Sequence, residues 1–193
     1  MDDDDELRSL ARRLRHESGA STLYERLLVT ADQEELAAVL TAPGRPLWAR
    51  ELAAFRLGRA GDRRAFEALV LLLNHRDPER CASAAHALYE LSDPRTPRAA
   101  AALATNELRV AYALVPVRLL IRLRAPESAP ALVTVLRRRL VPGDPYGRLA
   151  LACVEGLGAL GDPRGRDVLT AARTRADLAA AAEASLARVV AAR

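Results

Sequence analysis

The sequence contains no lysine, although 29 of its 193 residues are basic, so every basic residue other than histidine is an arginine. Codon bias in a GC-rich genome is the simpler explanation. The functional alternative is a surface selected for the bidentate contacts that arginine makes to phosphate or carboxylate groups. The net charge of +4 is too small to decide between these two explanations, because 25 acidic residues are interspersed with the arginines. A nucleic-acid-binding protein more often concentrates its positive charge.

Residues for metal, redox or nucleophilic chemistry are also scarce. The two cysteines, Cys81 and Cys153, lie in apolar helical segments and are expected to be small core residues in a reduced compartment. The three histidines have no metal-ligand spacing, and neither Cys-x-x-Cys nor His-Glu-x-x-His occurs. No serine lies in a Gly-x-Ser-x-Gly elbow. We therefore expect no metal, no cofactor and no enzymatic activity.

Aromatic residues make up only 4% of the chain, so the core must consist of alanine, leucine and valine. The few glycines and prolines are clustered and leave long windows of good helix formers, which predicts an all-α fold. The N-terminus begins with an acidic run, Asp2 to Glu6, where a secretory signal would need basic residues followed by an apolar run. No apolar stretch approaches the roughly 20 residues of a membrane-spanning helix. We expect a cytoplasmic protein with no membrane partner.

One motif recurs along the chain. Residues 157–163 read Leu-Gly-Ala-Leu-Gly-Asp-Pro, and decayed copies begin at Leu57, Leu88 and Leu120. The four opening leucines are 31, 32 and 37 residues apart. A period of this size is typical of stacked helix pairs in which each unit buries its apolar face against the next.

This period predicts four two-helix units. The expected first helices are 47–59, 78–91, 107–123 and 145–160, and the expected second helices are 63–74, 94–105, 126–139 and 163–174. A closing helix is expected at 178–192, and three N-terminal helices at 6–16, 22–30 and 32–40. The proline- and glycine-containing break at 41–46 predicts a helical cap over residues 1–45 and a repeat array over residues 46–193.

Asp-Pro dipeptides mark the expected junctions, at Asp77, Asp93, Asp144 and Asp162. An aspartate can cap a helix by accepting a hydrogen bond from its first turn, and proline fits the first helical position. Pro116 falls inside the expected helix 107–123, where it is predicted to free a carbonyl and bend the axis.

These motifs resemble the HEAT repeat, and more closely the short subtype found in phycobilisome-lyase-like proteins. The match is closest in residues 150–169 and 50–72. The second copy has Tyr89 and Ser92 in place of the glycines, and the third has Ala125 in place of the aspartate. The resemblance covers about residues 46–193 and implies a right-handed α-solenoid of four HEAT-like units with helical caps.

In such solenoids the second helices line the concave face. Their exposed side chains are expected to form a positive strip that suits an acidic segment of a protein partner. The residues expected in this strip are Arg63, Arg64, Arg95, Arg98, Arg137, Arg138, Arg139, Arg164 and Arg166, with Tyr146 as a possible aromatic anchor. We therefore expect a non-enzymatic adaptor or regulatory module that binds another protein through its groove.

The alternative is a nucleic-acid-binding HEAT protein, similar to the HEAT-type DNA glycosylases, in which the arginine strip contacts phosphates. In that case Trp48, the only tryptophan, would lie at the lesion; otherwise it fills the core between cap and first repeat. Bilin lyases share the short repeat, but the aromatic groups expected in a tetrapyrrole pocket are scarce here.

Overall fold

The computed structural model describes residues 3–19 and 21–191, and within these ranges every regular element is a helix. This confirms the all-α fold. The predicted end of the last helix at Ala192 lies outside the described residues. The α-helices are α1 (Asp3–Ser18), α2 (Thr22–Val29), α3 (Gln33–Thr41), α4 (Leu47–Arg59), α5 (Phe66–Leu73), α6 (Pro78–Leu91), α7 (Thr96–Ala104), α8 (Leu114–Leu123), α9 (Ser128–Arg139), α10 (Gly147–Leu160), α11 (Arg166–Ala172) and α12 (Ala179–Ala191). Short 3-10 helices are η1 (Arg63–Ala65), η2 (Glu107–Tyr112) and η3 (Pro163–Gly165).

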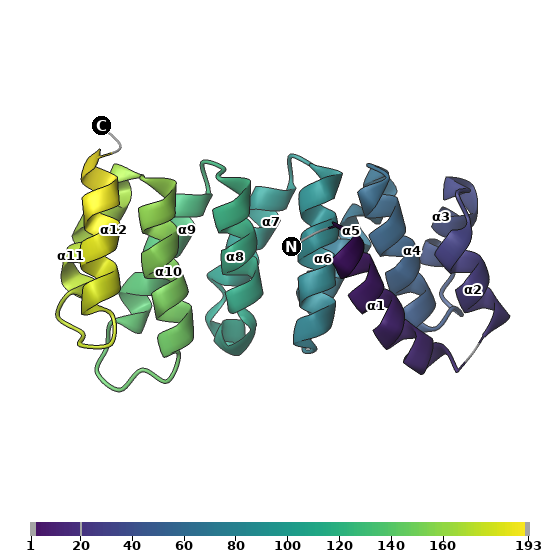
Figure 1. The fold of residues 1–193 in the computed structure, drawn as a ribbon, viewed down its shortest axis with the longest axis horizontal. Coiled ribbons are helices and arrows are strands. Elements are labelled where there is room, and N and C mark those ends of the chain that lie inside the picture. Colours follow the sequence, from purple (N-terminus) through teal and green to yellow (C-terminus); the bar gives the residue numbers. More distant parts are fainter. Residues whose placement is uncertain (1–2, 20, 192–193) are drawn as a thin grey trace. The chain divides into compact units, whose positions relative to one another are not determined.

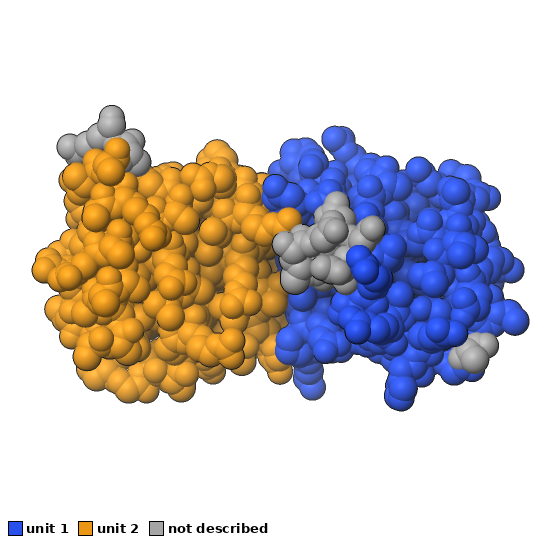
Figure 2. All heavy atoms as spheres, viewed as in Figure 1, with its two compact units in different colours: residues 1–96 blue, residues 97–193 orange. Residues whose placement is uncertain are grey.

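The chain folds as two compact units, residues 1–96 and residues 97–193 (Figure 2). This division differs from the predicted one between residues 45 and 46. The reason is that α3 packs directly against α4, and α1 packs against both α4 and α6. The N-terminal helices therefore share a core with the first repeats.

In the first unit, α4 packs against α5 and α6, and α1 lies across α4 and α6 (Figure 1). The core contains Leu52, Leu69 and Leu88, all fully buried. Trp48 of α4 contacts Tyr24 of α2 edge to face, with the ring centroids 6.2 Å apart. Trp48 thus lies between the predicted cap and the first repeat, but its side chain is half-buried and not part of the buried core.

In the second unit, α10 packs against α8, α9 and α12, and α11 packs against α12 (Figure 1). Leu120, Leu132 and Leu157 are fully buried between these helices. We call the side of each unit formed by its first helices the first-helix face: α4 and α6 in the first unit, and α8, α10 and α12 in the second. The opposite side, formed by α5 or by α7, α9 and α11, is the second-helix face.

At three junctions the capping aspartate is also paired with an arginine. In each case the aspartate accepts a hydrogen bond of 2.9 Å from the backbone amide two residues later, and the guanidinium of that same residue binds the carboxylate. We call these pairs the Asp–Arg clamps: Asp62–Arg64, Asp93–Arg95 and Asp162–Arg164. The hydrogen bond from the arginine side chain is the main cause that lowers the pKa of each aspartate below its ordinary value of 3.8.

The clamps predict a loss of stability in acid. A carboxylate whose pKa is lower in the folded chain stabilises the fold above its unfolded pKa, and that contribution disappears as the pH falls through the folded pKa. Asp93→Asn keeps an oxygen for the cap but removes the charge. We expect the variant to unfold a few degrees below the native protein at pH 7. The two melting temperatures should converge as the pH falls through the lowered pKa of Asp93, because Asp93 is then protonated in the native protein as well. Thermal unfolding by circular dichroism across pH measures this, and a constant difference at all pH values would contradict it.

Three positions depart from the prediction. The carboxylates of Asp93 and Asp144 accept the amides of Arg95 and Tyr146, but α7 and α10 begin only at Thr96 and Gly147. Each aspartate therefore caps the residues just before its helix and not the helix itself. Pro116 does not bend a long helix. The predicted helix 107–123 is divided, with non-helical backbone at Arg109, and Pro116 lies in the first turn of α8, where its missing amide is not needed.

The helix ends show how far the repeats have decayed. Gly61 and Gly161 follow α4 and α10 with φ of 75° and 68°, the left-handed conformation that glycine adopts without strain. At the equivalent places after α6 and α8, Ser92 and Arg124 adopt φ of 51° and 50°. A side chain in this conformation costs about 1–2 kcal/mol, so the two middle copies keep the turn at a local cost.

Candidate functional site

The residues predicted to form a positive strip lie in both units. Arg63, Arg64 and Arg95 belong to the first unit, and Arg98, Arg137, Arg138, Arg139, Tyr146, Arg164 and Arg166 belong to the second. The contacts of these residues differ from one unit to the other.

In the first unit, all three predicted arginines are paired with acidic side chains. The pairs outside the clamps are Arg63–Asp93 at 4.0 Å, Arg64–Glu34 at 2.9 Å and Arg95–Glu67 at 3.1 Å. The guanidinium of Arg95 also lies over the ring of Phe66, 3.9 Å from its centroid. These arginines bind groups of their own unit.

In the second unit, the end of α9 is also paired. Arg138 and Arg139 both bind Glu107 of η2, at 3.0 and 2.9 Å, and Arg139 binds Asp144 at 3.2 Å. The guanidinium of Arg139 lies 5.7 Å from the centroid of the Tyr146 ring. The proposed aromatic anchor therefore packs beside an internal ion pair.

Three predicted arginines, Arg98, Arg137 and Arg166, have no ion pair with any residue in 3–19 or 21–191. They lie apart, on α7, at the end of α9 and at the start of α11. Arg166 is half-buried, and its Nε has no hydrogen-bond partner among the described groups. Most of the predicted positive charge on the second-helix face is thus balanced within its own unit.

A groove of about 540 Å³ lies on the other side of the second unit, over the first-helix face. In Figure 2 this face of residues 97–193 is turned toward the viewer. The groove is bounded by α8, α10 and α12. Six of its lining residues are small, namely Ala152, Gly156 and Ala159 from α10, and Ala181, Ala184 and Ser185 from α12. The larger apolar lining residues are Ile121 of α8 and Leu151 of α10.

Two glycines let the helices around the groove approach closely. A Cβ atom at Gly156 would collide with the side chains of Ile121 and Leu132. A Cβ atom at Gly158 would lie 2.7 Å from the backbone Cα of Ser185 in α12. Because real side chains are excluded at such distances, α10 can pack this tightly only with glycine at these positions.

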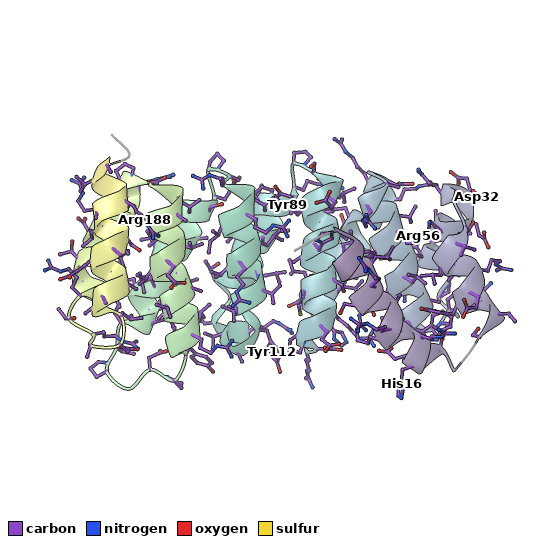
Figure 3. The ribbon with its side chains drawn as sticks, viewed as in Figure 1. His16, Asp32, Arg56, Tyr89, Tyr112 and Arg188 are labelled. Atoms are coloured by element: carbon purple, nitrogen blue, oxygen red, sulfur yellow. The ribbon has the colours of Figure 1, made fainter. Side chains whose placement is uncertain are left out.

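Charged side chains surround this small-residue lining. Arg118 of α8, Arg148 at the start of α10 and Arg188 of α12 are exposed and line the groove together with one acidic residue, Glu155. Arg188 is labelled in Figure 3, on α12 beside α10. None of the three arginines has an ion pair with any residue of the described ranges. The groove thus gathers three such guanidinium groups around one lining, whereas Arg98, Arg137 and Arg166 on the second-helix face lie apart.

In the first unit the first-helix face is already covered by a helix. α1 lies across α4 and α6, and its Leu10 and Leu14 are 3% and 0% exposed. The Tyr24 hydroxyl donates a 2.7 Å hydrogen bond to the carbonyl of Ala11 and holds α1 against α2.

A buried ionic cluster fixes α1 on this face. Glu51 of α4, only 1% exposed, binds the guanidinium groups of Arg13 from α1 and Arg80 from α6. Glu17 of α1 binds Arg80 at 2.6 Å and Arg13 at 3.2 Å. Burial lowers the pKa of Arg13, but the hydrogen bonds and charges of Glu51 and Glu17 outweigh burial and raise it overall. We call Arg13, Glu17, Glu51 and Arg80 the α1 cluster.

The remaining reactive side chains have packing roles. His86 is buried and stacks on Phe55 with the ring centroids 6.0 Å apart. Burial raises the pKa of the Cys153 thiol to about 12. Within the described ranges, no group of three or more histidine, cysteine or acidic side chains could hold a metal ion. Nor does any described helix have the length and apolar character needed to cross a membrane.

The sequence did not lead to a prediction of the groove, because the partner-binding surface was expected on the second helices. The sequence does contain an indication that first-helix positions are exposed to solvent. Arg118 and Glu155 stand at the same place in their copies, two residues before Leu120 and Leu157. A charged residue at that point of an apolar first helix indicates that the position faces solvent.

Comparison with known proteins supports the repeat at one place in the chain. Residues 149–173, which span most of α10, η3 and α11, match the family described as the PBS lyase HEAT-like repeat. This is the fourth helix pair, which carries the most complete copy of the motif. No curated protein matches the chain.

Proposed function

We propose that this helical-repeat protein is a non-enzymatic adaptor or regulatory module, and that it binds another protein through the groove bounded by α8, α10 and α12. The observation that supports this most strongly is the groove itself, which combines a mostly small apolar lining with three arginines that have no ion pair within the part of the chain that the structure describes. HEAT-like repeats often serve as protein-interaction scaffolds, and the match at residues 149–173 is consistent with that role.

A substitution within α12 tests the proposal. Ala184 is exposed and lines the groove, whereas Ala187 is exposed on the same helix but does not line it. Ala184→Trp should fill the groove and abolish the recovery of a specific partner in affinity purification from the source organism. Ala187→Trp, the matched control, should leave the recovery unchanged.

Recovery that is equal for both tryptophan variants would mean that the partner binds elsewhere, and the proposal would then be wrong. Melting temperatures of both variants must match that of the native protein, so that a loss of binding is not a loss of folding. Quantitative mass spectrometry of the recovered proteins provides the measurement.

Nucleic-acid binding is the alternative, favoured by the same unpaired guanidinium groups, since Arg118, Arg148 and Arg188 could contact phosphates. We expect no sub-micromolar binding to duplex or single-stranded DNA or RNA of about 20 nucleotides near physiological salt. Glu155 lies among the arginines and would repel a continuous polyanion. Fluorescence anisotropy between about 50 and 200 mM salt measures this, and tight binding with a steep log–log salt slope would establish the alternative.

A further inference from the structure

We infer that the groove on α8, α10 and α12 receives an amphipathic α-helix of another protein, with an apolar ridge flanked by acidic residues. This inference rests on the proposed function and names the class of partner.

The first reason is the way in which this protein covers its own first-helix face. In the first unit, α1 lies on α4 and α6 with Leu10 and Leu14 buried, which are four residues apart and so share one side of the helix. Arg13 and Glu17 of α1 flank that apolar ridge and form ion pairs with the helices beneath. A first-helix face of this chain is therefore demonstrably complementary to an amphipathic helix.

The second reason is the shape of the open face in the second unit. Ala152, Gly156 and Ala159 on α10 and Ala181 and Ala184 on α12 line the groove, so most of its apolar lining is small, with Ile121 and Leu151 as the larger apolar side chains. Small residues allow a helix to approach closely, and large apolar side chains of that helix can then fill the groove. Its volume of about 540 Å³ is sufficient for several leucine-sized side chains.

The third reason is charge. Arg118, Arg148 and Arg188 come from three different helices, so they surround the groove instead of forming one run. Carboxylates on both sides of an incoming apolar ridge would reach them, and bidentate pairing favours carboxylate over other polar groups. The acidic Glu155 can pair with a basic residue of the partner and fix its register.

A second copy of this chain is a less suitable occupant. Its helix with the appropriate character, α1, is held on its own unit by the α1 cluster. If α1 left, Glu51 would lose Arg13 and Arg80 would lose Glu17, and only their pair with each other would remain. Removing part of the pairing of a buried charge is unfavourable. The groove is therefore assigned to a helix from another protein.

A display library of helix-forming peptides of about 18 residues tests the class of partner. The full chain is the target, and Ala184→Trp is the counter-target that removes peptides bound outside the groove. We expect groove-dependent peptides with leucine-like residues at i and i+4 and with aspartate or glutamate beside them. Replacing the acidic residues of such a peptide by their amides should weaken binding about tenfold, because three exposed ion pairs are lost.

Charge reversal provides the decisive comparison. A variant with Arg118→Glu, Arg148→Glu and Arg188→Glu should select peptides with lysine or arginine beside the same apolar ridge. As a matched control, reversal of Arg137, which is exposed and unpaired on the second-helix face, should leave the selected sequences acidic.

The outcomes separate the two proposals. Groove-dependent peptides that are neutral or basic would overturn the acidic-helix class and leave the proposed function intact. The same holds if no peptide is selected while affinity purification still recovers a groove-dependent protein. If neither experiment shows dependence on the groove, both proposals are wrong. Oligonucleotide binding that disappears with the three arginine substitutions would also overturn both.

Discussion

Replacing Glu51 with alanine is expected to lower the free energy of unfolding by about 3–5 kcal/mol, because it removes a buried carboxylate that pairs with the buried Arg80 and the half-buried Arg13. Glu51 is only 1% exposed and binds both Arg13 and Arg80, whose side chains are 14% and 9% exposed. Glu17 remains near both arginines and compensates in part, so the lower end of the range is expected. Urea or guanidinium unfolding followed by circular dichroism measures the change.

The loss should be concentrated at α1, the helix that the cluster fixes in place. Hydrogen exchange and limited proteolysis of α1 should therefore accelerate more than exchange in α10, which belongs to the other unit. Glu67→Ala is the control, because Glu67 is exposed and, among the described residues, forms its ion pair with the exposed Arg95. A surface pair of this kind contributes little, so the control should unfold like the native protein. Equal stability of Glu51→Ala and the native protein would show that apolar contacts alone hold α1.

Replacing Gly158 with alanine is expected to destabilise the protein by about 2–3 kcal/mol, although alanine is the better helix former. In an unconstrained helix this substitution would instead gain about 1 kcal/mol. At Gly158 the new Cβ would lie 2.5 Å from the Oγ, 2.6 Å from the Cβ and 2.7 Å from the Cα of Ser185. Because a backbone atom cannot rotate away, α10 and α12 must separate. Denaturant unfolding measures the loss.

Two glycines provide matched comparisons for Gly158→Ala. At Gly156 the three atoms nearest to the new Cβ are side-chain atoms, Cδ1 and Cγ1 of Ile121 and Cδ2 of Leu132. These can move without displacing a helix backbone, so Gly156→Ala should destabilise the protein less. At Gly44 no atom lies within 4 Å, and Gly44→Ala should be nearly neutral. If Gly158→Ala were as stable as Gly44→Ala, the close contact of α10 and α12 would not hold in solution.

Much of the fold could be predicted from the sequence, since the positions of the leucines and the Asp-Pro junctions depend on local rules. The predicted helices at 47–59 and 78–91 coincide with α4 and α6. The prediction is poorest in the third copy, where Ala125 replaces the capping aspartate. The apolar periodicity there continues through Arg109, whereas the backbone at Arg109 has a non-helical conformation. Periodicity reports which side of a helix is apolar, but it does not report where the hydrogen-bonded ladder is interrupted.

The candidate site was harder to predict because it depends on pairing across the fold. The arginines expected to bind a partner, such as Arg64 and Arg95, contact Glu34 and Glu67, which are 30 and 28 residues away in the chain. Nothing local in the sequence distinguishes them from Arg118, Arg148 and Arg188, which have no ion pair within the described ranges. The sequence thus indicates how many arginines there are, and only the structure indicates which of them are available to a partner.

Each unit contains one buried cysteine, and the reactivity of its thiol would measure the unfolding of that unit. Cys81 lies in α6 of the first unit and Cys153 in α10 of the second, and each is at most 2% exposed. A thiol reagent can attack only when the surrounding helices open, because the thiolate is the reactive form and burial raises the pKa of Cys153 to about 12. The rates of native-state alkylation at the two positions would therefore give two separate opening equilibria. Their ratio would show whether the two halves of the chain unfold as one cooperative block or independently.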